Sequence, residues 1–495
     1  MSQVVNGSEH RHDLVILGGR VIDPESGTDA QLNVGVTGST ITAVTTLPIM
    51  GARTLDARGR VVAPGWIDLH SHAQSVAGGR LQARDGVTSA LELESGVLDV
   101  AHTIRLASLE GRPINFGFSS SWELARLVEV AGLDADDPLA DLHRHKGSLD
   151  WMRAGTKREL IRLKTRIAAN LESGAIGIGF LLGYAPEVEP SEYLEMSCLA
   201  ASYNAGTFTH ARDLVEHHPR TLIDGAIEIV QAAEATGVRA HYCHINSTSL
   251  KALPRVHDLI RRASSTVTTE AYPYGAGSTS IEAAFLSPDR LYERALEPSS
   301  LVYTPTGERI QNRARLEELR RTDPGGLVIV HLLDESKSAD QDIIDEAMLF
   351  EGTVVASDAM PLKWPGLTKD PFNWPPPSAT TTHPRGAGTF SRFLRRYVVE
   401  LEALTLLEAV ARCSFRPATI LEPYVPAMAR KGRLKVGADA DIVVIDLSRI
   451  SDRATYSNGA LPSVGYELVL VNGTPIVRDD ELDLQSFPGR AITAA

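Results

Sequence analysis

From about residue 65 onward, short apolar runs alternate with longer stretches of helical periodicity, and this alternation limits the chain to few architectures. Repeated strand–helix units of this kind are typical of a parallel sheet covered by helices. Eight apolar runs are spaced as strands: WIDLH, SALELE, NFGFS, AIGIGF, GTFTHA, RAHYCHI, TVTTEAY and GTVVASD. Eight units predict a (β/α)8 TIM barrel, in which the chemistry lies at the carboxyl ends of the strands.

The two ends of the chain have a different pattern. The first 62 residues contain short alternating strands separated by Gly, Asp and Asn, and the tail returns to strands in GRLKVGADADIVVIDL and YELVLVNGTPIVRD. We therefore predict an α/β fold in which residues 1–62 and 426–495 form a small β-sandwich beside a barrel of residues 63–425. Two segments interrupt the barrel as candidate lids: 281–325, which reads as an inserted helical piece, and 360–385, which is rich in proline.

The composition excludes several classes of protein. The chain has 495 residues, and an apolar content of 43% is ordinary for a globular protein with a large core. A net charge of −13 without a block of Lys and Arg argues against a nucleic-acid partner. Cys198, Cys243 and Cys413 are too scattered for a disulfide framework. The opening MSQVVNGSEHRHD has no apolar leader, and no run approaches the roughly 20 apolar residues of a membrane span. We expect a soluble cytoplasmic protein that acts on a small molecule and whose terminal strands permit a homo-oligomer.

An aspartate and two histidines alternate directly after the apolar run VVAPGWI. Alternate residues of a strand share a face, so Asp68, His70 and His72 are expected to point into the barrel near its mouth. Two imidazoles at this spacing can bind one metal ion, with Asp68 holding a ring N–H. The alternative is that the two histidines are polar residues that cap a strand.

Other polar side chains end later strands. His210 closes GTFTHA and His244 closes RAHYCH. A single strand-end histidine is more often a hydrogen-bonded core residue than a ligand, but four of them on one rim favour a metal site. His241 has the opposite parity to His244 and is interpreted as structural. Asp358 ends GTVVASD, where an acid is costly to bury without a cation or hydrogen-bond donors. We expect Asp358 to move a proton beside a metal-activated water, and the alternative is a helix N-cap.

The strand SALELESG carries two carboxylates on one face, Glu92 and Glu94. Two carboxylates inside a barrel require a cation, and Glu94, which is nearer the carboxyl end, is the better candidate for a metal ligand. Glu92 then lies deeper and needs a partner such as Arg or Lys. In the alternative interpretation the strand bulges and Glu92 is the ligand.

Over nearly its whole length, the sequence resembles the branch of the amidohydrolase superfamily that contains the D-aminoacylases and N-acyl-D-amino-acid deacylases. The segments that carry the resemblance occur in the order of that branch, and the YPYxxGST and HPRxxGTF patterns are specific to it. They are LVILGGRVIDPESG, APGWIDLHSH, DGVTSALELESG, AYPYGAGST, HPRGAGTFSRFLRRYV, GADADIVVIDL, DRATY and VLVNGTPIV.

The resemblance implies a role for individual residues. His70 and His72 match the metal pair of the first strand, and Asp358 matches the catalytic aspartate. His210 and His244 match metal ligands on later strands. The residues that match substrate contacts of the family are Tyr272 and Ser278 in YPYGAGST, and Arg385 in HPRG, whose guanidinium suits a substrate carboxylate.

The sequence also departs from the branch. D-aminoacylases carry a metal-ligating cysteine in a GNCG turn, whereas the run here is LELESG, so a glutamate must replace the thiolate. The family's lysine after the later histidine ligand is replaced by Asn246 in HINSTS, which we take as the corresponding substrate-side residue. This combination is more similar to the relatives labelled D-glutamate deacylases. The strand AIGIGF has no lysine, which argues against the carboxylated-lysine bridge of hydantoinases and dihydroorotases.

The sequence therefore predicts a hydrolase with one or two divalent ions, of the zinc type, that cleaves the amide bond of an N-acyl amino acid, in particular an N-acyl-D-amino acid such as N-acyl-D-glutamate. In this hypothesis a metal-activated water attacks the amide carbonyl, and Asp358 serves as general base and then as general acid. The two alternatives are a hydrolase of a cyclic or specialised small amide and a non-catalytic barrel scaffold.

Overall fold

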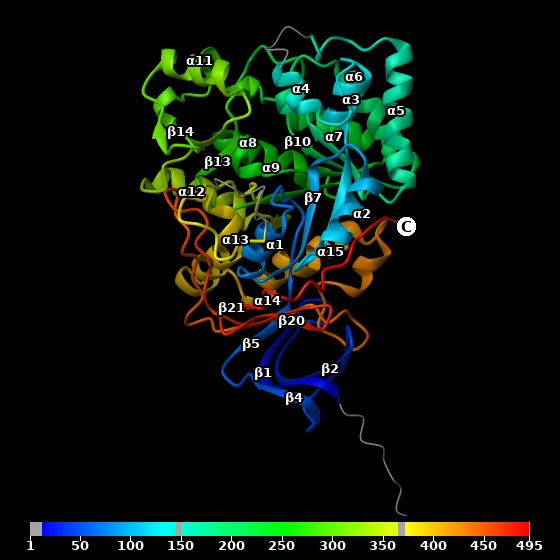
Figure 1. Ribbon diagram of the computed structural model, residues 1–495, viewed down its shortest axis with the longest axis vertical. Coiled ribbons are helices and arrows are strands. Elements are labelled where there is room, and N and C mark those ends of the chain that lie inside the picture. The colour runs from blue at the N-terminus through cyan, green and yellow to red at the C-terminus, as the bar shows by residue number, and fades with distance from the viewer. Residues whose placement is uncertain (1–11, 145–149, 365–371, 495) are drawn as a thin grey trace, which may run out of the picture.

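The computed structural model describes residues 12–144, 150–364 and 372–494 (Figure 1). The start of the chain, where the sequence predicts no apolar leader, lies outside the described residues, as does the stretch 365–371 of the proline-rich segment. Within the described part of the chain, no helix combines the length and the apolar character that a membrane span needs.

Eight parallel strands form the sheet of the barrel, in the order β17-β12-β11-β10-β9-β8-β7-β6. The edge strands are joined across the seam, where a parallel bridge links Ser71 to Ala359 and the His72 N–H donates to the Ala359 carbonyl at 2.8 Å. Each strand coincides with one of the eight apolar runs, which confirms the predicted TIM barrel. The strands are β6 (Trp66–Asp68), β7 (Val87–Val97), β8 (Asn115–Ser121), β9 (Gly177–Leu181), β10 (Gly206–His210), β11 (Arg239–Tyr242), β12 (Val267–Ala271) and β17 (Thr353–Val355).

Capping residues mark the ends of the helices between the strands. The Thr156 hydroxyl accepts from the Glu159 N–H while the Glu159 carboxylate accepts from the Thr156 N–H, so a capping box starts the helix α5. Asp224 caps α7, and Gly237, with a φ of 72°, ends it in the left-handed conformation. The larger barrel helices are α1 (Val76–Ala83), α2 (Val100–Glu110), α3 (Trp122–Glu129), α5 (Lys157–Glu172), α6 (Pro190–Ser202), α7 (Gly225–Thr236), α9 (Leu253–Arg262), α12 (Ser338–Leu349) and α13 (Arg385–Leu394).

Strands from both chain ends pair in one nine-stranded sheet, which lies below the barrel in Figure 1. The connection between the two ends is antiparallel, with Val443 opposite Ala63 and Val444 opposite Val62. Leu14, Ile16, Val34, Ile442 and Leu468 belong to one apolar core that both ends share. The predicted union of the two ends is confirmed. The strands are β1 (His12–Asp23), β2 (Thr28–Thr37), β3 (Thr40–Thr45), β4 (Gly51–Asp56), β5 (Val61–Pro64), β18 (Ile442–Ile445), β19 (Tyr466–Val471), β20 (Thr474–Arg478) and β21 (Glu481–Leu482).

The segment 281–325 is not the purely helical insertion that its sequence suggests. It belongs to a lobe that contains a four-stranded sheet in the order β13-β16-β14-β15 as well as two helices. The lobe occupies the upper part of Figure 1, at the side of the barrel mouth opposite α5. Its elements are β13 (Ala276–Ser280), α10 (Pro288–Glu293), β14 (Leu301–Tyr303), β15 (Glu308–Arg309), α11 (Arg313–Thr322) and β16 (Leu327–His331).

Candidate metal centre

The predicted metal-binding side chains all come from the carboxyl ends of barrel strands. His70 and His72 follow β6, Glu94 lies near the end of β7, and His210 is the last residue of β10. His244 follows β11 by two residues and Asp358 follows β17 by three. Because the strands are parallel, these ends meet at one rim, and residues almost 300 positions apart in the sequence become neighbours.

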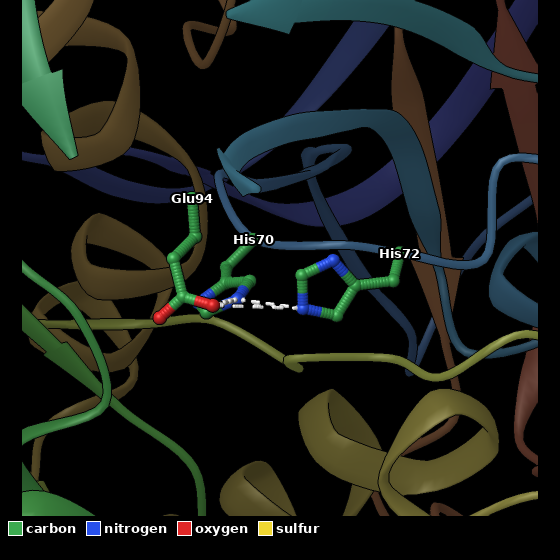
Figure 2. Close-up of side chains that lie close together, drawn as sticks. All are labelled: His70, His72 and Glu94. Atoms are coloured by element: carbon green, nitrogen blue, oxygen red, sulfur yellow. Dashed lines mark hydrogen bonds and ion pairs between the residues drawn. The ribbon is translucent and has the colours of Figure 1, made fainter. Parts of the chain in front are cut away.

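The carboxylate of Glu94 lies at the centre of the histidines. Its Oε2 is 3.2 Å from Nε2 of His70 and 3.7 Å from Nε2 of His72, and Figure 2 shows both rings turned toward it. Its Oε1 is 2.7 Å from Nε2 of His244 and 3.3 Å from Nδ1 of His210. Each oxygen of Glu94 therefore faces a different pair of imidazoles.

Asp358 completes the cluster from the other side. Its Oδ1 lies 3.4 Å from Nε2 of His72 and 3.5 Å from Nε2 of His70. Within the described residues, ligand atoms within 4.8 Å of one another form four overlapping groups, and three of these consist of predicted ligands. The three are His70–His72–Glu94, His70–His244–Asp358 and Glu94–His210–His244. Imidazole nitrogens and carboxylate oxygens are the donors of zinc sites, so the residues present fit a divalent cation.

The electrostatics of the cluster agree with a cation site. Although burial opposes ionisation, the neighbouring His70, His244 and His210 hold the pKa of the Glu94 carboxyl well below its usual range. Burial likewise opposes a charge on His70, but Glu94 and Asp358 raise its pKa well above the usual value. The pKa of His72 rises to about 10 against its burial because Glu92 and Asp358 adjoin it. The carboxylates of the cluster thus favour a positive charge among the histidines, and a metal ion can supply that charge in place of protons on the imidazole rings.

Two glutamates orient the first pair of histidines from behind. Nδ1–H of His70 donates to Glu270 Oε1 at 2.5 Å, and Nδ1–H of His72 donates to Glu92 Oε2 at 2.7 Å. With Nδ1 engaged in this way, Nε2 of each ring faces the cluster. The strand β7 does have an irregular register after Glu92, but Glu94 is the carboxylate among the histidines, and the partner of Glu92 is His72 rather than Arg or Lys.

The structure corrects the expected role of Asp68. Its carboxylate accepts from the N–H and hydroxyl of Ser357 and from the Gln82 side chain, and its contact with His70 is with the main-chain N–H at 3.2 Å. Asp68 therefore ties β6 to the end of β17 rather than holding an imidazole. The reason is that Glu270, on the neighbouring wall, already occupies the Nδ1–H of His70.

Sequence reasoning missed Glu270. This residue lies in β12 and is 1% exposed, and its second oxygen is 3.0 Å from Nε2 of His241. His241, which we interpret as structural, is thus part of a chain of contacts that ends at His70. The signal was present, because an acid near the end of the apolar strand TVTTEAY is as costly to bury as Asp358.

Asp358 is held by an arginine and does not cap a helix. Nη2 of Arg385 lies 2.8 Å from Oδ1 of Asp358, and Arg385 also lies over the ring of Tyr272, 4.7 Å from its centroid. Burial raises the pKa of Asp358, but Arg385 and His70 outweigh this and keep it below its usual value. The backbone at Asp358 has a φ of 49°, a strained conformation of the kind that persists where surrounding contacts impose it.

A cavity of about 920 Å³ opens above the cluster. Tyr272, Ser278 and Arg385, the residues expected to contact substrate, all line it. Both candidate lid segments contribute to its wall, for example through Phe285 of the inserted lobe and Met360 of the proline-rich segment.

Asn246 is placed differently from the other expected substrate contacts. It is 2% exposed, and its side-chain amide donates to the Tyr272 carbonyl at 3.2 Å and accepts from the Tyr272 N–H at 3.4 Å. It is not among the residues that line the cavity. The carboxamide is occupied by the backbone, so its contact is with the strand end that carries Tyr272.

Comparison with known proteins supports the same branch as the motifs. The model of the amidohydrolase family matches residues 216–477. An N-acyl-D-glutamate deacylase of Alcaligenes xylosoxydans xylosoxydans is 28% identical over 94% of this chain and 94% of its own length, and a D-aminoacylase of the same organism is 26% identical over 97% and 96%. A crystal structure of N-acyl-D-glutamate deacylase from Bordetella bronchiseptica, in complex with zinc and a phosphonate mimic of the tetrahedral intermediate, superposes with a TM-score of 0.75 at 24% identity, covering 98% of this chain and all of that one. The family match spans more than half of the chain, and the protein belongs to the amidohydrolase family.

Proposed function

We propose that this protein is a metal-dependent hydrolase that cleaves the amide bond of an N-acyl-D-amino acid. The observation that carries the proposal is the convergence of four imidazoles and two carboxylates on one rim of the barrel, at the floor of the cavity. The residues that would hold the metal are His70, His72, Glu94, His210, His244 and Asp358.

A divalent cation such as Zn²⁺, once bound at this rim, would supply Lewis acidity toward a carbonyl oxygen and would lower the pKa of water to about 7. The Asp358 carboxylate is ionised, because Arg385 and His70 lower its pKa, and it is therefore a base that accepts a proton from the attacking water. The same carboxyl then donates that proton to the leaving nitrogen.

Arg385 is suited to the substrate carboxylate. Its guanidinium is fully enclosed, and Nε and Nη1 have no hydrogen-bond partner among the described residues. A buried guanidinium with free donors is costly unless a ligand engages it, and its planar fork matches a carboxylate. The Tyr272 ring packs against Arg385, and Ser278 lines the same cavity. Asn246 would act on the substrate indirectly, through the backbone that holds Tyr272.

The D configuration and the zinc ion are supported by the relatives. The curated relatives are named N-acyl-D-glutamate deacylase, D-aminoacylase and N-acyl-D-aspartate deacylase, and a solved neighbour contains zinc. A cytoplasmic location is part of the same proposal, since Cys198, Cys243 and Cys413 are free thiols, the state that a reducing compartment preserves.

The test is a substrate panel combined with metal analysis of the purified protein. N-acetyl-D-amino acids, their L enantiomers, hydantoins and small aryl amides are assayed with and without prior chelation. We expect bound divalent metal and hydrolysis of N-acetyl-D-amino acids that chelation abolishes and zinc restores. Turnover of hydantoins alone would replace the proposed substrate class, and a protein without stoichiometric metal or hydrolysis would be a scaffold.

A further inference from the structure

Glu123 lines the cavity and has no role in the proposed chemistry. It lies in the first turn of α3, which begins where β8 ends, and its side chain is 9% exposed and lines the cavity. An acid in the first turn of a helix often serves the helix terminus. Here Ser121 already caps α3 by accepting from the Leu124 N–H, and Glu123 accepts no main-chain N–H from any described residue.

The carboxylate of Glu123 has no hydrogen bond and no ion pair within residues 12–144, 150–364 and 372–494. Nearby buried acids differ in this respect. Glu192 pairs with Arg126 at 2.5 Å, and Glu228 pairs with Arg212 at 3.0 Å. Since burying an acid without a partner is costly, a carboxyl left open toward a cavity indicates a ligand that engages it.

The surroundings of Glu123 favour a positive ligand. Burial, together with the negative charges of Glu282 and Glu94, raises the pKa of its carboxyl to about 8. Two arginines of the inserted lobe that line the same cavity are engaged elsewhere. Arg294 pairs with Asp213, and Arg320 donates to main-chain carbonyls of the lobe, with Ala283 at 3.0 Å.

Tyr184 packs against the metal centre and lines the same cavity as Glu123. Its ring is 4.9 Å from the ring of His210 and 5.3 Å from that of Phe285. Burial raises the pKa of the Tyr184 hydroxyl, and the negative charges of both Glu94 and Glu123 act in the same direction, so Tyr184 lies within electrostatic reach of both carboxylates. A substrate held at the histidine cluster can thus pass along an aromatic wall, which suits an aliphatic stem that ends in a cation.

We propose that Glu123 is the receptor for an ammonium or guanidinium group at the end of the substrate's amino-acid side chain. This inference rests on the proposed function and narrows its substrate class to N-acyl derivatives of basic D-amino acids. Acidic side chains, which the curated relatives named for glutamate and aspartate accept, are disfavoured at this wall.

The experiment compares kcat/KM for three substrates of similar length, N-acetyl-D-lysine, N-acetyl-D-norleucine and N-acetyl-D-glutamate, in the zinc-loaded protein and in Glu123→Gln. The native protein should prefer the lysine derivative to the norleucine derivative by about tenfold or more, as for a hydrogen bond to a charged group. The Glu123→Gln side chain cannot ionise when a cationic substrate binds, and the substitution removes no internal hydrogen bond. The variant should therefore lose this preference while it hydrolyses the norleucine derivative at the native rate. Glu318→Gln, an exposed position on α11, is the control for the same change of net charge and should keep the preference.

The outcomes separate this inference from the proposed function. Hydrolysis of the norleucine derivative without preference for lysine, or an equal loss on all three substrates in Glu123→Gln, overturns the role of Glu123 and leaves the deacylase proposal standing. A faster reaction with the glutamate derivative in the native protein also overturns it. Failure to hydrolyse any N-acetyl-D-amino acid overturns both.

Discussion

Glu270 lies directly behind the proposed metal ligand His70. Its two oxygens join Nδ1 of His70 and Nε2 of His241, in the interior of the barrel. An anionic acceptor on the far side of an imidazole fixes the ring and makes its other nitrogen more basic. Glu270 is therefore a positioning residue, and we expect its substitution to change the affinity for metal more than the stability of the fold.

Glu270→Gln should lower the affinity for zinc by about 10- to 100-fold, because glutamine can still accept the hydrogen bond but carries no charge. The measurement is a competition titration with a chromophoric chelator. Glu192→Gln, a change at a buried acid that pairs with Arg126, is the matched control and should leave the affinity unchanged. Equal affinities in native protein and Glu270→Gln would show that Glu270 is only structural.

His257 provides a residue-scale test of burial far from the metal centre. Its ring stacks on Phe350 with centroids 3.9 Å apart, and burial, aided by the charge of Arg261, lowers its pKa to about 4. The folded state thus binds the proton less readily than the unfolded state, whose histidine has a pKa near 6.5. Stability from this group is complete above about pH 6.5 and is lost as pH falls toward 4.

Between pH 7 and pH 4, the native protein should lose on the order of 2 kcal/mol more unfolding free energy than His257→Leu, which cannot titrate. Denaturant unfolding of both proteins after chelation measures the difference, since the metal centre then titrates equally in the two. If the unfolding free energies of the two proteins changed equally with pH, the lowered pKa of His257 would be contradicted.

At the scale of elements, the helices take their limits from short local signals. The exposed N-terminus of α5 is a clear example, because Thr156 and Glu159 satisfy each other's main-chain N–H groups. Thr156→Ala should reduce the unfolding free energy by about 1 kcal/mol, whereas Thr156→Ser retains the hydroxyl and should reduce it far less. Equal losses in the two variants, measured by denaturant unfolding, would show that the cap hydroxyl does not stabilise the helix.

The sequence predicts the barrel elements better than the inserted lobe. The sequence locates all eight barrel strands because short, largely apolar runs alternate with helical stretches. Parallel pairing then brings His70, His72, His210, His244 and Asp358 to one rim. The lobe gives no such pattern: β14 has three residues, β15 has two, and β13 is AGSTS, without apolar alternation. Strands this short depend on tertiary pairing and on the shared core around Leu301 and Val328, which local periodicity does not reveal.

At the scale of the whole molecule, the barrel and its inserted segments form the cavity, and the sheet from the chain ends lies apart from it. The barrel provides the rim that carries the proposed metal ligands, and the inserted lobe and the proline-rich segment provide walls of the cavity. The sheet from both chain ends lies at the other side of the barrel (Figure 1). The sequence predicts only in part which side chains form hydrogen bonds with one another. The alternation of side chains along the strand predicts that Glu92 shares a face with Glu94 and not with Leu93. It does not predict that Glu92 contacts His72, or that Ser357 rather than an imidazole donates to Asp68.

Hydrolysis at the proposed metal centre should depend on the carboxylate of Asp358. The most direct measurement is the bound-metal content and the rate of N-acetyl-D-amino-acid hydrolysis of Asp358→Asn beside the native protein. Asn keeps the size of the side chain while removing its basicity, so we predict near-native zinc content with turnover reduced by about 10²-fold or more. Near-native turnover with zinc bound would contradict the claim.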